Sequence, residues 1–464
     1  MLKFGTSGLR GLVTEMTDPV CAAYAGAFLR HLGQARELLV GQDLRPSSAR
    51  IAAACIAAVR AEGVTVVDCG VVPTPALALE AGRRGAPAIM VTGSHIPFDR
   101  NGLKFYRPEG EITKADEAGI VAALDGAAGT LSAPVEAGTT AAAHYVARCV
   151  DFFGAGCLAG RRIGLYQHSA AGRDLMADAL ATMGADVVPL GRTDGFVPID
   201  TEAIAAEDAA RIRDWVVEHR LAALVSTDGD GDRPLIADET GAVLRGDTVG
   251  ALAARALGAD AVATPINAST ALERSGWFTR IRRTRIGSPY VIEGIEALSA
   301  DGARLPVGYE ANGGFLLGGT AERPDGRRLP PLTTRDALVP IAALLAQTAA
   351  EGIALSDLVR LLPTRVTASD RLQEVDVPAA NRLLAALAND AHTRDSLLEG
   401  LGAGSVASVD TLDGVRMTLA SGEILHVRMS GNAPELRCYC EAETPARAEA
   451  LMAAALARLA SRLR

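Results

Sequence analysis

A strand–loop–helix–strand pattern occurs three times along this chain, and it constrains the fold more than any other feature. The copies are ELLVGQDLRPSSARIAAACIAAVRAEGVTVVDCG at 37–70, RIGLYQHSAAGRDLMADALATMGADVVPLG at 162–191 and ADAVATPINASTALERSGWFTRIRRTRIG at 259–287. In each copy, short apolar runs flank an Ala-rich segment that begins near Ser, Thr, Asn or Gly, which is typical of a β-α-β unit in a parallel or mixed sheet. The copies lie too far apart for a solenoid repeat. The pattern therefore predicts three related α/β domains.

The last hundred or so residues follow a different pattern. The segment SVDTLDGVRMTLASGEILHVRMSGNAPELRCYCEAET alternates like antiparallel strands joined by tight turns. A final helix is predicted from Pro445, with Thr444 as its N-cap. The predicted fold class is thus α/β, with three α/β domains containing mixed sheets at 1–150, 151–255 and 256–366, and a C-terminal α+β domain at 367–464.

The composition argues against several classes of protein. The net charge is −9 and no long basic tract occurs, which argues against nucleic acid as a partner. No apolar run reaches the about 18 residues of a membrane span, and MLKFGTSGLRG lacks a signal-peptide core. The seven cysteines are scattered, and the CYC at 438–440 has no further ligand at metal spacing. We therefore expect a cytoplasmic protein with reduced thiols and no membrane partner.

The segment VTGSHIPFDRNGLKFYRPEG begins where the apolar run PAIMVT ends. Ser94 would lie at the carboxyl end of a strand, where α/β sheets place ligand-binding groups. His95 could orient or deprotonate that serine. Ser and Asn also commonly cap their own turns, so a purely structural loop remains an alternative. No G-x-S-x-G elbow surrounds Ser94, so an acyl-transfer triad is not indicated.

Three aspartates alternate with glycine in STDGDGDRPLIADE: Asp228, Asp230 and Asp232. Carboxylates this close repel one another unless a cation neutralises them, and oxygen ligands favour Mg²⁺ or Ca²⁺. An EF-hand loop would have Glu239 at its twelfth position, but its sixth would be Arg233 instead of glycine, and a strand precedes it. A solvated acidic turn is the other alternative. The spacing favours a magnesium loop.

A third motif, VGYEANGGFLLGG, carries Glu310 and Asn312 on a glycine-rich bend. Two residues apart on an extended chain, both side chains would face the same side. A carboxylate and an amide together suit sugar hydroxyls. The alternative is a turn in which Asn312 supports the bend.

A fourth motif, VRMSGNAPELRCYCEAE, brackets a turn with polar side chains: Arg428, Ser430, Gly431, Asn432 and Arg437. Guanidinium groups, a hydroxyl, an amide and free backbone N–H groups can form a phosphate cradle. The alternative is an ordinary hairpin with exposed arginines. Other arginines, among them Arg10, Arg45 and the group in RIRRTRIG, are predicted to lie mostly on polar strand faces, with one or two facing an anion.

Taken together and in this order, these motifs resemble the α-D-phosphohexomutase superfamily: GTSGLRG, TGSH, DGDGDR, GYEANGG and RMSGNAPELR. The resemblance covers nearly the whole chain. It implies a heart-shaped enzyme of four domains with one motif in each. It also implies an intramolecular phosphotransferase that interconverts hexose 1-phosphate and hexose 6-phosphate through a phosphoserine and a 1,6-bisphosphate.

The resemblance implies a role for each motif. Ser94 would carry the phosphate, and one Mg²⁺ per chain would be held by Asp228, Asp230, Asp232 and a phosphate oxygen on Ser94. Around the transferring phosphate the family positions match Arg10, His95, Lys104 and Arg233. Glu310 and Asn312 match the sugar-binding pair. The grip on the other phosphate matches Arg428, Ser430, Gly431 and Asn432, with Arg437 beside them. Hexose 1,6-bisphosphate would act as the activator.

Several positions depart from the family pattern. Ile96 stands where the serine loop commonly has Asn, and Asn432 and Ala433 replace Thr and Glu. Some members have His where Gly314 stands, so His95 or Lys104 would have to manage the proton. The motif variants look most like those of bacterial phosphomannomutases. Phosphoglucomutase, phosphoglucosamine mutase and a non-catalytic sugar-phosphate-binding paralogue remain alternatives. A monomer or weak homodimer is expected.

Overall fold

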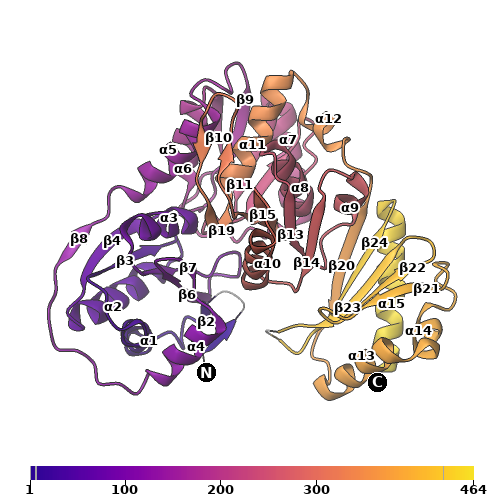
Figure 1. The fold of residues 1–464 in the computed structure, drawn as a ribbon, viewed down its shortest axis with the longest axis horizontal. Helices are drawn as coiled ribbons and strands as arrows, with labels where there is room; N and C mark the ends of the chain where they lie inside the picture. Colours follow the sequence, from indigo (N-terminus) through magenta and orange to yellow (C-terminus); the bar gives the residue numbers. More distant parts are fainter. Residues whose placement is uncertain (1, 6–7, 432, 464) are drawn as a thin grey trace.

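The fold was determined as a computed structural model, which describes residues 2–5, 8–431 and 433–463. The described residues form four larger sheets that follow one another along the chain in an arc (Figure 1). The N-terminal and C-terminal sheets lie at the two ends of this arc. The mixed α/β architecture with an α+β C-terminal part confirms the predicted fold class.

The N-terminal sheet has the strand order β1-β2-β6-β5-β3-β4-β8, and β7 pairs with β6. The first predicted repeat is confirmed, because β3 and β4 are parallel and α2 connects them. The antiparallel β6 runs beside β5 and makes the sheet mixed. The strands are β1 (Lys3–Gly5), β2 (Gly8–Leu12), β3 (Glu37–Gln42), β4 (Thr65–Val71), β5 (Ala88–Val91), β6 (Arg100–Arg107), β7 (Gly110–Glu111) and β8 (Val135–Ala137). The helices are α1 (Asp18–Leu32), α2 (Ser48–Ala61), α3 (Thr74–Arg84) and α4 (Lys114–Ala122).

The second sheet has the order β10-β9-β11-β12. Its parallel pair β9–β10, joined by α6, is the second predicted repeat. The antiparallel pair β11–β12 forms the hairpin that carries the aspartates. The elements are α5 (Ala141–Phe153), β9 (Arg162–Tyr166), α6 (Arg173–Thr182), β10 (Asp186–Leu190), α7 (Ala206–His219), β11 (Ala223–Thr227) and β12 (Pro234–Ala237).

The third sheet has the order β14-β13-β15-β16-β19, and the third repeat is its parallel pair β13–β14. Its strands are β13 (Ala261–Pro265), β14 (Arg280–Thr284), β15 (Pro306–Tyr309), β16 (Phe315–Leu317) and β19 (Leu332–Asp336), with a separate ribbon of β17 (Ala321–Glu322) and β18 (Arg328–Leu329). The helices are α8 (Gly246–Ala256), α9 (Ala271–Ser275), α10 (Ser288–Ala300), α11 (Leu338–Glu351) and α12 (Leu355–Val359).

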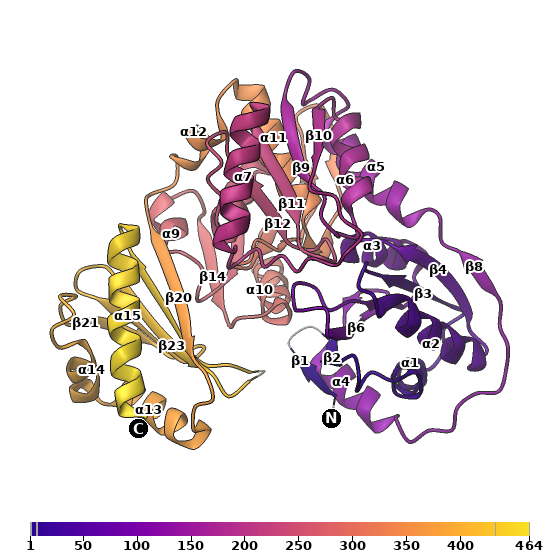
Figure 2. The same ribbon diagram turned by 180° about the vertical axis from the view of Figure 1, so that it is seen from behind.

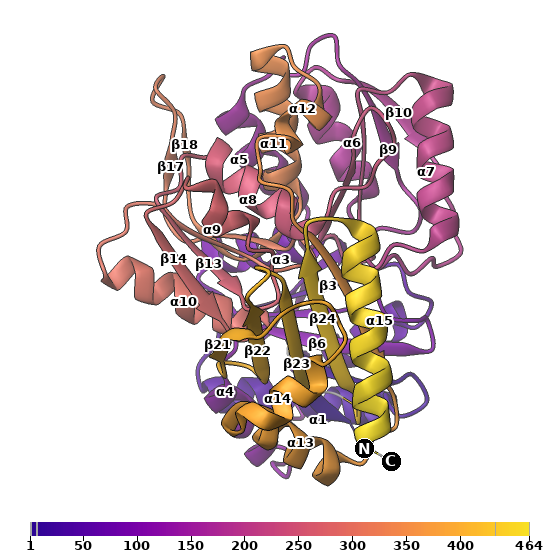
Figure 3. The same cartoon turned by 90° about the vertical axis from the view of Figure 1, so that its right-hand side faces the viewer.

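The C-terminal sheet is antiparallel throughout, with the order β20-β24-β23-β22-β21. Figure 3 shows its helices gathered against one face. The predicted cap of the last helix is confirmed, because the Thr444 side chain accepts from the backbone N–H of Arg447. The elements are β20 (Val366–Leu372), α13 (Val377–Asn389), α14 (Ala391–Leu398), β21 (Val406–Asp410), β22 (Val415–Leu419), β23 (Ile424–Met429), β24 (Leu436–Ala442) and α15 (Pro445–Arg462).

The hydrophobic cores do not correspond one to one with the four larger sheets. One continuous core joins the second and third sheets, because α11 packs against both α8 and α5. The N-terminal and C-terminal sheets have cores of their own. The domain limits near 150, 255 and 366 therefore stay a prediction. No helix in the described part of the chain is both long and apolar enough to cross a bilayer.

Candidate active site

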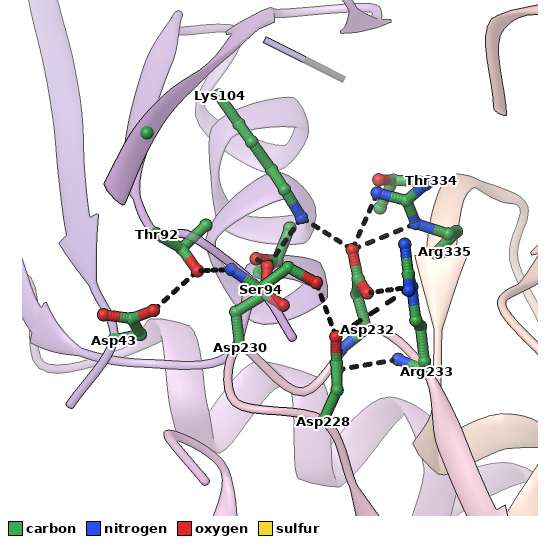
Figure 4. Close-up of polar contacts among 12 residues, drawn as sticks. Asp43, Thr92, Ser94, Lys104, Asp228, Asp230, Asp232, Arg233, Thr334 and Arg335 are labelled. Carbon is green, nitrogen blue, oxygen red and sulfur yellow. Dashed lines mark hydrogen bonds and ion pairs between the residues drawn. The ribbon is translucent and has the colours of Figure 1, made fainter. Parts of the chain in front are cut away.

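The serine loop leaves the sheet at β5, whose four residues are all buried. Ser94 is itself buried and takes the left-handed conformation, with φ of 54°. Its backbone N–H donates to Thr92 Oγ1 at 2.8 Å, and its Oγ donates to Asp228 Oδ2 at 2.6 Å (Figure 4). The serine hydroxyl thus points toward the loop of residues 228–232 in the second sheet, which we call the metal loop.

The side chain of Arg45 binds the backbone of this serine loop. Its guanidinium donates to the carbonyl oxygens of Ser94 at 2.7 Å, Pro97 at 2.7 Å and Arg100 at 3.0 Å, and also to that of Ile96. It pairs with Asp43 at 3.2 Å, and both side chains are fully buried. The ring of Phe196, from the segment after β10, lies 4.2 Å from the guanidinium carbon. Arg45 is therefore committed to the backbone of the loop and to Asp43, and its buried side chain does not face solvent or a ligand.

The metal loop is the tight turn between β11 and β12, on which Asp228, Asp230 and Asp232 are all buried. One ligand atom from each carboxylate lies within 4.8 Å of the others. Gly231 has φ of 71°, a conformation that glycine adopts without strain. A Cβ atom on Gly229 would lie 2.9 Å from the Ser94 carbonyl, so glycine there lets the serine loop approach. The sequence prediction that the three aspartates converge is confirmed.

The pKa values of the three carboxylates shift in different directions, because each carboxylate has different charged neighbours. Burial raises the pKa of Asp228 well above its usual value, and the repulsion from Asp230 and Asp232 adds to this effect. Burial also opposes ionisation of Asp232, but Arg335 and the Lys104 ammonium outweigh it and lower its pKa. The pKa of Asp230 is lowered as well, because Lys104 outweighs burial and the repulsion from Asp232. A cation is needed for all three to be ionised together.

The donor set suits a hard divalent cation. Asp230 Oδ1 and Asp232 Oδ1 are buried and, in the described part of the chain, accept no hydrogen bond. Such atoms carry a large desolvation penalty unless an ion or water binds them. Oxygen ligands of this kind are the ones that Mg²⁺ and Ca²⁺ prefer. The EF-hand alternative does not fit, because the loop joins two strands and Glu239 binds Ser356 instead.

Lys104 lies on β6 and is 5% exposed. Its Nζ donates to Asp230 at 2.6 Å and to Asp232 at 2.7 Å. Thr74 Oγ1, at the start of α3, also donates to Asp230 at 2.6 Å. Lys104 thus links the N-terminal sheet to the metal loop, as a cation that the carboxylates hold in place.

His95 lies beside Ser94, but its closer partner is Arg233. Its Nδ1 lies 2.8 Å from Arg233 Nη1 and 3.4 Å from Ser94 Oγ. Burial lowers the pKa of His95 to about 2, and Arg233 and Arg10 add to the effect. The imidazole is therefore neutral, and its Nδ1 accepts from Arg233. Burial likewise lowers the pKa of Arg10 to about 10, which leaves that guanidinium charged.

The sugar loop joins β15 to β16 and differs from the extended arrangement expected from the sequence. It is a tight turn, in which Gly313 N–H donates to Glu310 O and Glu310 N–H donates to Gly314 O. Asn312 Oδ1 accepts from Gly314 N–H at 3.0 Å, as in the alternative in which Asn312 supports the bend. The Glu310 carboxylate accepts from Arg335 at 3.1 Å. The expectation that an extended chain aligns these two side chains was wrong, because residues 310–314 close a hydrogen-bonded turn.

Arg335, at the end of β19, is a site residue that the sequence analysis missed. Its Nε and Nη2 bind Asp232 Oδ2 at 3.0 and 2.9 Å, and its side chain is 3% exposed. The segment PLTTRDAL places it at a strand end beside Asp336, whose Oδ1 accepts from the first two backbone N–H groups of α11. That position at the carboxyl end of a strand was the available signal.

The predicted phosphate loop is the turn between β23 and β24, which points toward the N-terminal unit (Figure 2). Arg428 lies opposite Arg437 in the strand register, and its Nε donates to Asp413 at 3.0 Å. Arg437 donates to Glu435 at 3.3 Å, and Ser430 N–H donates to the Glu435 carbonyl at 2.9 Å. Gly431 is exposed. Asn432 lies outside the described residues.

Known proteins resemble this chain in sequence or in fold over nearly their whole lengths. Residues 1–128, 245–366 and 364–458 match, in turn, domain I, domain III and the C-terminal domain of phosphoglucomutase/phosphomannomutase. A phosphomannomutase of Salmonella muenchen is 44% identical, with 100% of this chain and 96% of that protein covered. One of Sinorhizobium fredii is 44% identical, with 99% of each covered.

The fold is shared with a phosphoglucomutase/phosphomannomutase family protein of Burkholderia thailandensis, whose crystal structure is 22% identical with a TM-score of 0.78. That alignment covers 98% of this chain and 97% of the other. The resemblance drawn from the motifs is confirmed by the full-length sequence matches. The chain belongs to the phosphoglucomutase/phosphomannomutase family of the α-D-phosphohexomutase superfamily, and it is an isomerase of the phosphohexomutase class.

Proposed function

We propose that this enzyme is a phosphomannomutase, which interconverts mannose 1-phosphate and mannose 6-phosphate through phosphorylated Ser94. The observation that carries the proposal is the Ser94 hydroxyl, which donates to Asp228 at 2.6 Å beside two buried carboxylate oxygens that accept no hydrogen bond in the described chain. The names of the two relatives at 44% identity support mannose as the sugar.

In the first half-reaction, a hydroxyl oxygen of the bound hexose phosphate attacks the phosphorus on Ser94. A P–O bond forms to the sugar, the P–O bond to Oγ breaks, and the sugar hydroxyl loses its proton while Oγ regains one. The Ser94 hydroxyl so released is the group that donates to Asp228 in this structure. The hexose 1,6-bisphosphate then turns over, and its other phosphate returns to Ser94.

This chemistry depends on positioning and charge more than on a strong base. Lys104 and Arg233 lie beside the acidic triad, and the charged Arg10 lies close to Arg233. His95 accepts from Arg233 and so fixes the direction of that guanidinium. These groups would stabilise the charge that spreads over the phosphoryl oxygens in the transition state.

The residues present fit one Mg²⁺ per chain. Asp228, Asp230 and Asp232 would hold it together with a phosphate oxygen on Ser94. When bound, it would neutralise the phosphate and the carboxylates and polarise the phosphoryl group. Lys104 and Arg335 bind the outer oxygens of these carboxylates, which leaves Asp230 Oδ1 and Asp232 Oδ1 for the ion.

The two ends of the substrate would meet different loops. Glu310 and Asn312 would bind sugar hydroxyls near the metal loop. The turn between β23 and β24 would grip the phosphate that is not transferred, through Arg428, Ser430, Gly431, Asn432 and Arg437. Hexose 1,6-bisphosphate would act as the activator, because it rephosphorylates any Ser94 that has lost its phosphate.

We also propose a cytoplasmic protein that is a monomer or a weak homodimer. All seven cysteines are free, and six of them are buried. Free thiols are typical of proteins in reducing compartments.

A coupled assay tests the function. Wild-type enzyme is supplied with Mg²⁺, a catalytic amount of hexose 1,6-bisphosphate and the 1-phosphate of mannose, glucose or glucosamine. The highest kcat/KM is expected for mannose, and Ser94→Ala should abolish turnover and the phosphate-sized mass increment. Ser132→Ala, a serine that binds only Arg60 in the described chain, serves as the control. A clear preference for glucose or glucosamine would overturn the mannose assignment, and full activity of Ser94→Ala would overturn the mechanism.

A further inference from the structure

Gly314 follows the sugar loop at the entry to β16, and Arg335 fills the space beside it. A Cβ atom on Gly314 would lie 2.4 Å from Cδ and 2.7 Å from Cγ of Arg335. Backbone conformation does not require glycine here, because Gly314 is absent from the residues with positive φ. The glycine is therefore explained by the close approach of the arginine.

Arg335 connects two loops that belong to different sheets. Its Nε and Nη2 bind Asp232 on the metal loop, and its Nη1 binds Glu310 on the sugar loop at 3.1 Å. Lysine cannot reproduce this planar fork. Burial opposes the charge of Arg335, but the two carboxylates outweigh it and raise its pKa well above the usual value. The guanidinium thus stays charged and fixed in direction.

The two carboxylate oxygens of Asp232 therefore have different surroundings. Oδ2 accepts from both Lys104 and Arg335, whereas Oδ1 accepts no hydrogen bond in the described part of the chain and has Arg233 Nε at 3.7 Å. Two donors on one oxygen fix the rotation of the carboxylate. Glu310 is fixed by the same guanidinium, so the metal loop and the sugar loop cannot shift independently.

We propose that Arg335 is a positioning residue of the mutase reaction, which takes the space beside Gly314 and holds Asp232 and Glu310 at a set separation. The inference rests on the proposed function, because it assigns the metal to Asp232 and the sugar to Glu310. The Arg335 side chain fills the space beside Gly314, where some family members carry histidine. Arg335 acts through the two carboxylates, and its role is to align the reacting hydroxyl with Ser94.

The first test is Arg335→Lys, with Arg148→Lys as a matched control. Arg148 is also buried and binds Asp336 at 3.0 Å, but it lies outside the site. Lysine keeps the charge but loses one or more of the charge-assisted hydrogen bonds of the fork, each of which corresponds to about tenfold to a hundredfold in binding. We expect such a loss in kcat/KM for Arg335→Lys, shared between a lower kcat and a higher KM, whereas Arg148→Lys keeps its kinetics and only unfolds at lower temperature. Wild-type kinetics in Arg335→Lys, or an equal loss in Arg148→Lys, would overturn the proposal.

The second test uses the space at Gly314 and does not require a charge to be removed. Gly314→Ala should displace Arg335 and lower kcat/KM in the wild-type background. In the Arg335→Ala background the two closest atoms are gone and only the Cβ of residue 335, at 3.2 Å, still faces the added methyl, so Gly314→Ala should cause a much smaller further loss. Additive losses, or a harmless Gly314→Ala in the wild type, would contradict the shared space. This test also decides the matter if Arg335→Lys does not fold.

A separate measurement distinguishes failure of this proposal from failure of the proposed function. Phosphorylation of Ser94 by hexose 1,6-bisphosphate is followed by intact mass in wild type and variants. If wild type is phosphorylated but does not prefer mannose, the sugar assignment fails while the Arg335 comparison stands. If wild type is not phosphorylated at all, the mutase mechanism fails, and the inference fails with it.

Discussion

Removal of the Arg45 side-chain donors should slow the enzyme by about tenfold or more without removing any group that contacts substrate. Arg45→Met keeps the length of the side chain and loses every donor. In the native protein the guanidinium serves four carbonyl oxygens of the serine loop and the carboxylate of Asp43. Methionine can still pack against Phe196. The variant therefore isolates the loss of the polar clamp.

Two contributions set the size of the effect. Breaking a buried ion pair by removing one partner destabilises a protein by about 3–5 kcal/mol. The Pro97 and Arg100 carbonyls lie on exposed residues, where water can replace the lost donor, whereas Ser94 is buried. Backbone strain of the kind found at Ser94, with its φ of 54°, amounts to about 1–3 kcal/mol. Without the clamp that strain is unopposed, so the productive loop should be about tenfold or more less populated.

The assay measures kcat, the rate of Ser94 phosphorylation by hexose 1,6-bisphosphate, and the midpoint of thermal unfolding. We expect both rates to fall by about tenfold or more, and the midpoint to fall as well. Arg50→Met is the control, since Arg50 makes an exposed ion pair with Asp18 and should leave all three values nearly unchanged. Wild-type phosphorylation kinetics in Arg45→Met would refute the reasoning, even if the variant unfolds more easily, because the clamp would then be structural only.

Three further predictions follow from the site and from the C-terminal sheet. Chelation of Mg²⁺, or Asp230→Asn, should abolish turnover while circular dichroism stays unchanged, and a metal-free enzyme that keeps its rate would contradict the metal assignment. Arg428→Ala should weaken hexose phosphate binding by about tenfold to a hundredfold and leave existing phospho-Ser94 in place; unchanged discrimination against a sugar without the second phosphate would show that the turn is not the cradle. Burial lowers the pKa of His426 to about 4, below its unfolded value of about 6.5, so its stabilising contribution is complete above pH 6.5 and is lost as the pH falls toward 4. Urea unfolding at neutral and acid pH should show a smaller acid loss for His426→Gln than for wild type, and equal losses would exclude this titration.

The residues that the sequence could locate are those whose chemistry is local. Ser94 follows a strand of four buried residues, and the aspartates share one hairpin turn, so a short segment contains each motif. Alternation of Asp with Gly was enough to predict that the carboxylates converge. The three β-α-β repeats were likewise readable, because the apolar runs, the Ala-rich helices and their starts lie within about thirty residues of one another.

The residues that the sequence could not locate act over long separations. Arg45 meets the carbonyl of Ser94 across 49 positions, and Arg335 meets Asp232 across 103. From the sequence, Arg45 was named only as one of several arginines that could face an anion, and Arg335 was not singled out, because only the fold brings each arginine to its partner. The two interpretations of Glu310 and Asn312 could not be separated from the sequence for a different reason. A glycine-rich segment can be extended or closed, and its hydrogen bonds decide between the two.

Under the proposed function, charge balance predicts that phosphorylation of Ser94 and metal binding favour each other. Three carboxylates converge in the metal loop, and Lys104, Arg233 and Arg335 each lie within ion-pair distance of at least one of them. With all three carboxylates ionised these three cations balance them formally, but burial and mutual repulsion raise the pKa of Asp228, an effect that a further cation would offset. A phosphate on Ser94 adds about −1.5 to −2 charges to a buried position, which the site could tolerate only with a matching cation. A dication alone would instead add positive charge beside three fixed cations. Under the proposed function each partner would lower the electrostatic penalty of the other, so this arrangement of fixed charges would suit the phosphorylated, metal-bound form.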